Sequence, residues 1–260
     1  MRREDFGALK QKFNDYVAGF YDINNKLEPT LQDKLDHILR VADNCVNIIN
    51  LMDLGKSDDL FLAEICGLYH DIGRFSQFKA FNTFNDKISV NHGLQGFKVI
   101  SSENMLNMLS DEEVCVILNS VRFHNALKIP YKLPERSQFF TNIVRDADKL
   151  DIINMVNKAI IRGEIFDDKS TVWNLEFDYL NPEIVQAIIN NKIAKYSDVK
   201  NATDVCFMQL SWIYDMNFKS TLHILAELKV IENIEKIVPI DNNTKITINH
   251  LKAYLNTKLK

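Results

Sequence analysis

The residues best suited to chemistry are an imidazole and a carboxylate that stand next to each other, His70 and Asp71. They follow a segment in which small and apolar residues recur at helical spacing, which predicts a buried helix with both groups at its C-terminal end. Neighbouring helix positions point about 100° apart, so both side chains can reach one cation at the helix edge. Gly73 then allows the chain to turn away.

Further candidate ligands lie in order around this pair, each in a largely apolar segment predicted to be helical: His37, His92, His124 and Asp148. Imidazole nitrogen together with carboxylate oxygen suits a divalent transition ion, whereas calcium prefers oxygen almost exclusively. Two alternatives stay open. His92 could instead cap the start of a helix, and His124 could be a structural or substrate-contacting histidine.

The helix that carries Asp148 also contains Asp146 and Asp151. Asp146 and Asp148 project about 200° apart on that helix, so only one of them faces the site easily. The apolar residues around them favour Asp148. Asp151 lies on the same side as Asp148 and could orient a ligating imidazole.

Three cations near these groups could grip phosphate oxygens: Arg74, Arg145 and Lys149. For Arg74 the alternative is an ordinary ion pair with a surface acid. For Lys149 it is a solvated position on the outer face of its helix.

The composition is that of an ordinary globular protein. Of 260 residues, 46% are hydrophobic and 25% charged, and the net charge of −4 is spread along the chain, which predicts no nucleic-acid-binding surface. The four cysteines are scattered, so we expect free thiols in a reducing compartment. No window reaches the roughly 18 apolar residues that span a bilayer, and a cytoplasmic location without membrane attachment is predicted.

Glycine and proline are sparse and amphipathic windows follow one another, so the sequence predicts an all-α fold built as one compact domain. Residues 75–91 interrupt the pattern and are interpreted as an irregular loop, anchored by its aromatic residues, that folds over the site. The expected helices cover about 4–24, 31–53, 57–71, 92–109, 110–124, 137–160, 182–195, 202–235 and 246–257.

The order His37, His70-Asp71 and Asp148 resembles the H…HD…D signature of the HD-domain metal-dependent phosphohydrolases. Gly73, and His92 followed by Gly96, resemble the bacterial group with the HDIG form of the motif. The resemblance covers about residues 30–160, and it implies an HD-domain helical bundle. Residues 165–260 lie outside it and are expected to form additional C-terminal helices.

The resemblance also implies a ligand set and roles. A divalent transition metal, Mn, Fe, Ni, Co or Zn, would be held by His37, His70, Asp71 and Asp148. In two-metal members the aspartate at the position of Asp71 bridges the ions, and His92 and His124 occupy the matching second-ion positions, so one or two ions per chain are expected. Asn125 stands where those members often carry a second histidine. Asp71, Arg74 and Lys149 are the expected catalytic residues, and Arg74, Lys149 and Arg145 the expected substrate contacts.

The implied reaction is hydrolysis of a phosphoester by a metal-activated water, with a nucleotide or similar small phosphate as substrate. One alternative is a regulatory module that keeps the metal site and senses a nucleotide without turnover. A less favoured third option is oxygenase chemistry, which also occurs on the wider HD scaffold. A homo-oligomer is compatible with the sequence.

Overall fold

The computed structural model describes residues 1–52, 57–162 and 175–260, and every regular element in those ranges is a helix. The predicted all-α fold class is therefore confirmed for the described chain. Its internal contacts group into two compact units, Met1–Asp148 and Lys149–Lys260. The boundary between them falls inside one long helix.

The interpretation of the chain as one domain, with a core at about 30–160 and an extension at 165–260, stays a prediction. The end of the helix expected over 31–53, and residues 163–174, lie outside the described residues.

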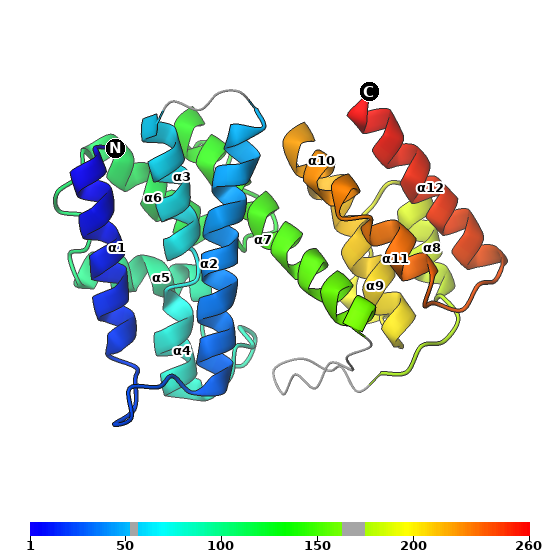
Figure 1. Ribbon diagram of the computed structural model, residues 1–260, viewed down its shortest axis with the longest axis horizontal. Coiled ribbons are helices and arrows are strands. Elements are labelled where there is room, and N and C mark those ends of the chain that lie inside the picture. The colour runs from blue at the N-terminus through cyan, green and yellow to red at the C-terminus, as the bar shows by residue number, and fades with distance from the viewer. Residues whose placement is uncertain (53–56, 163–174) are drawn as a thin grey trace. The chain divides into compact units, whose positions relative to one another are not determined.

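The first unit is a bundle in which α1, α3 and α2 lie side by side (Figure 1). Its helices are α1 (Arg3–Ala18), α2 (Pro29–Asn50), α3 (Ser57–Tyr69), α4 (Gly73–Phe81), α5 (His92–Ser102), α6 (Asp111–Phe123) and the N-terminal half of α7 (Glu135–Arg162). The start of α6 is a capping box: Ser110 and Glu113 each accept a hydrogen bond from the other's backbone N–H.

Buried aromatic rings fix the end of α3 and the start of α4. Phe13 of α1 lies 5.7 Å from Tyr69 and 6.5 Å from Phe75 between ring centroids, and all three side chains are fully buried. The hydroxyl of Tyr69 donates to the carbonyl of Leu9 at 2.8 Å. Burying one such ring contributes on the order of 1.5–3 kcal/mol. This packing therefore holds the turn between Tyr69 and Gly73, which contains the His-Asp pair.

Close backbone approach brings α2 and α3 together. A Cβ atom added at Gly67 would lie 2.7 Å from the Cα of Ala42, a distance that real Cβ atoms do not show. Only glycine permits this approach without a shift of one helix. Because His37 and His70 lie on these two helices or their ends, their rings come within 5.4 Å of each other.

Gly73 has the same role between α4 and α5. A Cβ atom there would lie 2.4 Å from the nitrogen of Gly96 and 2.5 Å from the carbonyl oxygen of His92. The chain turns at residues 70–72, and Gly73 already begins α4. Its importance therefore lies in close packing rather than in freedom to turn.

The interpretation of residues 75–91 as irregular is wrong for the first part, where α4 continues to Phe81. Apolar periodicity did not reveal this short helix because it buries a polar residue, Gln77, beside Phe75. Asn82 ends it in the left-handed conformation with φ 51°, and its N–H donates to the carbonyl of Phe78 at 2.7 Å. The irregular connection is thus residues 82–91.

Several predicted helices are shorter than expected. The first ends at Ala18 and α5 ends at Ser102. The segment predicted as one helix over 202–235 consists of several short ones, because the chain turns near Met216 and Lys229.

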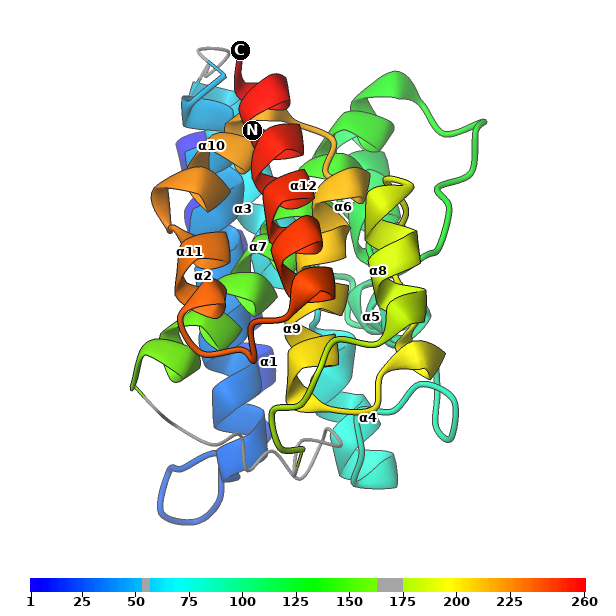
Figure 2. The same ribbon diagram turned by 90° about the vertical axis from the view of Figure 1, so that its right-hand side faces the viewer.

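The second unit packs short helices against the C-terminal helix, as Figure 2 shows for α8, α10 and α11 around α12. Its core contains fully buried Ile184, Phe207, Leu210 and Leu251. Besides the C-terminal half of α7, its elements are α8 (Pro182–Ile189), η1 (Tyr196–Asp198), α9 (Ala202–Leu210), η2 (Ser211–Asp215), α10 (Lys219–Glu227), α11 (Val230–Glu235) and α12 (Asn242–Leu259).

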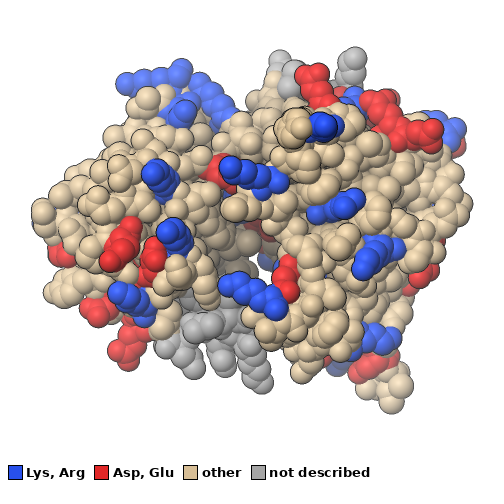
Figure 3. Space-filling view, turned by 180° about the vertical axis from the view of Figure 1, so that it is seen from behind, with Lys and Arg blue, Asp and Glu red and all other residues tan. Residues whose placement is uncertain are grey.

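Among the described helices, none combines the length and the apolar character that crossing a bilayer requires. On the face drawn in Figure 3, basic and acidic side chains are interspersed. The absence of a nucleic-acid-binding surface stays a prediction.

The contact at Gly73 generates a stability prediction. Gly73→Ala forces α4 and α5 apart or strains their backbones, so we expect a loss of about 1–3 kcal/mol in the free energy of unfolding. The matched control is Gly7→Ala in the exposed middle of α1, where an added Cβ meets nothing within 4 Å. That change should be neutral or stabilise by up to about 1 kcal/mol. Chemical denaturation of the three proteins measures both effects, and equal stability of the two variants would contradict the packing role of Gly73.

Candidate metal centre

The first unit brings together the six side chains that the sequence analysis named as ligands. They are His37 on α2, His70 and Asp71 in the turn after α3, His92 at the start of α5, His124 at the end of α6, and Asp148 on α7. Their nitrogen and oxygen atoms form three overlapping groups within which all atoms lie within 4.8 Å of one another. All six side chains are buried except Asp148, which is 24% exposed.

Asp71 lies at the centre of this cluster, and its two oxygens face different imidazoles. Oδ2 is 3.6 Å from Nε2 of His70 and 3.8 Å from Nε2 of His37. Oδ1 is 3.4 Å from Nε2 of His92 and 3.5 Å from Nε2 of His124. The carboxylate therefore lies between two sets of nitrogen atoms.

In His70 and His124, the hydrogen bond made by Nδ1 determines which ring nitrogen is free to bind a metal ion. Nδ1 of His70 lies 2.7 Å from the carbonyl oxygen of Gly67, and Nδ1 of His124 lies 2.8 Å from that of Val121. A carbonyl oxygen can only accept, so both Nδ1 atoms carry the proton and both Nε2 atoms point a lone pair into the cluster. Among the described residues, Nε2 of His70 has no hydrogen-bond partner.

His92 completes the pattern. Its Nδ1 lies 2.7 Å from Oδ2 of Asp86, and its Nε2 lies 3.0 Å from Nε2 of His124. With protons on both Nδ1 atoms, two lone pairs face each other at this distance, and they repel unless a cation or a proton lies between them. The donor set thus fits a divalent transition ion: imidazole nitrogens held in one tautomer, and carboxylate oxygens.

Asp148 faces His37, with Oδ1 3.2 Å from Nε2. Burial alone would raise the pKa of Asp148, but the hydrogen bond and charge of His37 outweigh it and hold that pKa well below its usual range. Asp146, the alternative on the same helix, is also fully buried.

Burial lowers the pKa values of His70 and His92, and the carboxyl of Asp71 stays charged. Burial lowers the pKa of His70 to about 3, against the attraction of Asp71. Burial would raise the pKa of Asp71, but the positive charges of Lys34 and Arg74 hold it well below its usual range. At neutral pH these are the protonation states that metal ligands need.

Arg74 lies beside the cluster and is 14% exposed. Its Nη1 donates to Oε1 of Gln77 at 2.9 Å, to the carbonyl of Phe84 at 2.7 Å and to Oδ1 of Asp86 at 3.0 Å. Nε lies 3.5 Å from Oδ1 of Asp71 and has no hydrogen-bond partner among the described residues. Nη2 lies 3.4 Å from Nε2 of His92. The guanidinium is therefore held through Nη1, and its Nε and Nη2 face the candidate ligands.

The other two predicted cations have different partners. Nη1 of Arg145 donates to the carbonyls of His124 at 3.1 Å and of Ala126, which stabilises the backbone that carries His124. Nζ of Lys149 forms an ion pair with Asp215 and donates to its carbonyl at 2.9 Å.

Two residues beside the cluster were missed by the sequence analysis. Lys34 Nζ lies 3.3 Å from Oδ2 of Asp71, and its position three residues before His37 on α2, hence on the same helix face, could have revealed it. Asp86, the hydrogen-bond partner of His92, lies in the irregular connection, where no periodicity indicates side-chain direction. Asp151 is buried as well, but the carboxylate that contacts Nδ1 of His92 is that of Asp86.

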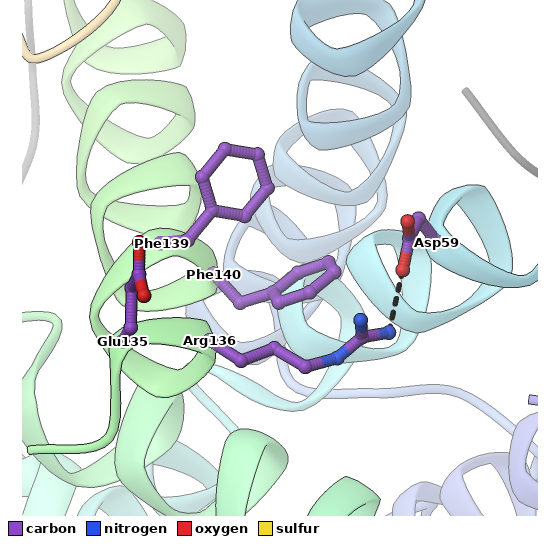
Figure 4. A pocket seen from close by; sticks show the side chains of 5 residues that line it. All are labelled: Asp59, Glu135, Arg136, Phe139 and Phe140. Atoms are coloured by element: carbon purple, nitrogen blue, oxygen red, sulfur yellow. Dashed lines mark hydrogen bonds and ion pairs between the residues drawn. The ribbon is translucent and has the colours of Figure 1, made fainter. Parts of the chain in front are cut away.

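A separate hollow of about 290 Å³ lies between the N-terminal ends of α3 and α7 (Figure 4). Arg136 crosses it, pairing with Asp59 and lying over the ring of Phe140. Its lining, completed by Glu135 and Phe139, contains none of the candidate ligands.

A protein-family model described as HD domain matches residues 35–153, a segment that contains every candidate ligand from His37 to Asp148. The comparisons with curated proteins and with solved structures found no match.

The placement of Asp148 generates a metal-binding prediction. Asp148→Asn removes a charged oxygen beside His37, so the variant should retain less divalent metal than the wild type after purification and dialysis. Asp146→Asn is the matched control two residues away, and it should retain wild-type metal even if burial of an amide lowers its melting temperature. Metal content measured by mass spectrometry checks both, and the reverse ranking would show that the wrong aspartate was assigned.

Proposed function

Because residues 35–153 match the HD-domain family, we propose that the chain is a metal-dependent phosphohydrolase or phosphodiesterase that acts on a nucleotide or similar small phosphate. Metal-dependent hydrolases make up most of that family. The observation that carries the proposal is the position of Asp71, with one oxygen toward His37 and His70 and the other toward His92 and His124.

This arrangement supports two ion positions. His37, His70, Asp148 and Oδ2 of Asp71 would hold the first ion, and His92, His124 and Oδ1 of Asp71 the second. The nitrogen-rich donor set suits Mn, Fe, Co, Ni or Zn. Divalent ions bound there lower the pKa of a water molecule and neutralise charge on a phosphoryl group.

The chain's own contribution to substrate binding would come from Arg74 and Lys34. Each lies next to a different oxygen of Asp71, Nε of Arg74 at 3.5 Å from Oδ1 and Nζ of Lys34 at 3.3 Å from Oδ2. Both cations also lie over the ring of Phe84, at 5.5 and 5.4 Å from its centroid. A phosphate held against the ligands would meet one positive group on each side, which orients it and neutralises its charge.

Arg145 and Lys149 stay predictions as substrate contacts. The proposal does not depend on them, because the hydrogen bonds and the ion pair described above already engage both side chains.

The first test is turnover. We expect the metal-loaded protein to hydrolyse a chromogenic phosphodiester, or a member of a panel of linear and cyclic nucleotides. His70→Ala should reduce that activity by more than the roughly 100-fold typical of losing an outer partner of a metal ligand.

The control for this test is His250→Ala, which removes a partly exposed histidine whose Nε2 contacts Asn191 in the second unit. It should keep full activity. Tight nucleotide binding without turnover would point to the sensor alternative, and oxygen uptake with a diol substrate to the oxygenase alternative.

The second test concerns Lys34. Lys34→Ala removes one charge-assisted contact to phosphate, so kcat/KM should fall roughly 10-fold to 100-fold while metal content is retained. Lys10→Ala is the matched control, because Lys10 pairs with Glu64 at the exposed surface of the same unit. Steady-state kinetics on the best substrate of the panel measures both, and wild-type kinetics for Lys34→Ala would exclude a role in phosphate binding.

A further inference from the structure

Asp86 lies in the connection between α4 and α5, and one of its oxygens contacts the second set of ligands. Oδ2 accepts from Nδ1 of His92 at 2.7 Å and from the His92 backbone N–H at 3.3 Å. It also accepts from Nδ2 of Asn125 at 3.3 Å. This oxygen therefore holds both the ring and the backbone of His92.

The other oxygen contacts the groups beside the proposed substrate position. Oδ1 accepts from Nη1 of Arg74 and from Nε2 of Gln77, both at 3.0 Å. Gln77 is fully buried, and its Nε2 also donates to Oγ of Ser89 and to the carbonyl of Val90. The connection that carries Asp86 is thus attached to α4 at several points.

We propose that Asp86 is a positioning residue that couples the second ion position to the phosphate-binding guanidinium. Its Oδ2 holds His92 in the tautomer that can bind a metal, and its Oδ1 holds Arg74 beside Asp71. This inference rests on the proposed function and assigns to that site a residue that neither the motif nor the ligand set includes.

The tautomer argument follows from what a carboxylate can do. An ionised carboxylate has no proton to donate, so the contact at 2.7 Å requires a proton on Nδ1 of His92 and leaves Nε2 with a lone pair. The amide nitrogen of Asn125 lies 3.2 Å from the same Nδ1, but the shorter contact to a charged acceptor decides the tautomer. Carboxylates that orient a metal-binding histidine in this way raise its basicity as well.

Asparagine at this position has nearly the same shape but cannot serve both sides. If its amide nitrogen faces His92, it donates to Nδ1 and moves the proton to Nε2, where it blocks metal binding. If the amide nitrogen faces Arg74, two donors oppose each other and the guanidinium loses an anchor. Either orientation of the side chain breaks one of the two connections.

The experiment is a titration of chelator-treated protein with Mn²⁺, with free Mn²⁺ followed by electron paramagnetic resonance. We expect two ions per wild-type chain. In Asp86→Asn the first should bind as in the wild type and the second about 10-fold to 100-fold more weakly. His92→Ala should also lose the second ion selectively, which identifies that position.

The control variant is Asp22→Asn. Asp22 accepts from the nearby backbone N–H groups of Asn24 and Lys26 in the exposed connection between α1 and α2, and asparagine can replace it there. Both ions should bind this variant as they bind the wild type. A second readout is the affinity of the Mn²⁺-saturated proteins for inorganic phosphate, which should fall in Asp86→Asn and stay unchanged in Asp22→Asn.

The outcomes separate the two levels of the proposal. A wild-type chain that binds no Mn²⁺ overturns the proposed function itself. Two ions in the wild type and the same two affinities in Asp86→Asn overturn the role of Asp86 alone. Equal weakening of both ions in Asp86→Asn, together with a lower melting temperature of the metal-free variant, also overturns it, because a general loss of structure would then explain the effect.

Discussion

The arrangement of the first unit depends on one buried carboxylate that has imidazole nitrogens on both sides. Asp71 keeps its charge inside the bundle because Lys34 and Arg74 compensate it at opposite oxygens. A buried charge without such partners would cost several kcal/mol. Each of these two oxygens also lies beside two histidines, so each could bind a cation together with its own pair of imidazoles. Lys34 and Arg74 therefore stabilise the fold of the unit, and they also keep Asp71 in the charged state that binding a cation requires.

Close helix packing is what allows the imidazoles to reach this carboxylate. At Gly67 and Gly73 the neighbouring backbones approach to distances that a Cβ atom would prevent. Aromatic packing of Phe13 against Tyr69 and Phe75 holds the intervening turn from the opposite side. Because α2, α3, α4 and α5 are positioned by these contacts, the candidate ligands are brought together by packed helices, which favours a site with defined geometry.

Hydrogen bonds behind the rings prepare the site further. The carbonyls of Gly67 and Val121 and the carboxylate of Asp86 each require a proton on Nδ1 of a different histidine, so three Nε2 lone pairs converge on the same small volume. Lone pairs that converge in this way repel one another, and a bound cation would turn the repulsion into attraction. Metal binding and folding of the first unit are therefore expected to be coupled.

The sequence by itself determined the all-α class and the order of the candidate ligands, because these depend on local periodicity and on residue type. It also indicated which aspartate of α7 to favour, since side-chain direction on a regular helix follows from position. The sequence did not predict the short helix α4. Its buried face includes Gln77, which is held by hydrogen bonds, so the apolar residues show no helical spacing there.

Only the tertiary structure decided which cations and acids stand beside the ligands. Arg145 and Lys149 are close to the motif in sequence, yet their polar groups are engaged with backbone carbonyls and with Asp215. Asp86 contacts His92 from an irregular connection, whose side-chain directions are fixed by long-range packing and not by a repeating backbone geometry. Contacts between segments far apart in the chain depend on how helices approach one another, and that information is not contained in any local pattern of residues.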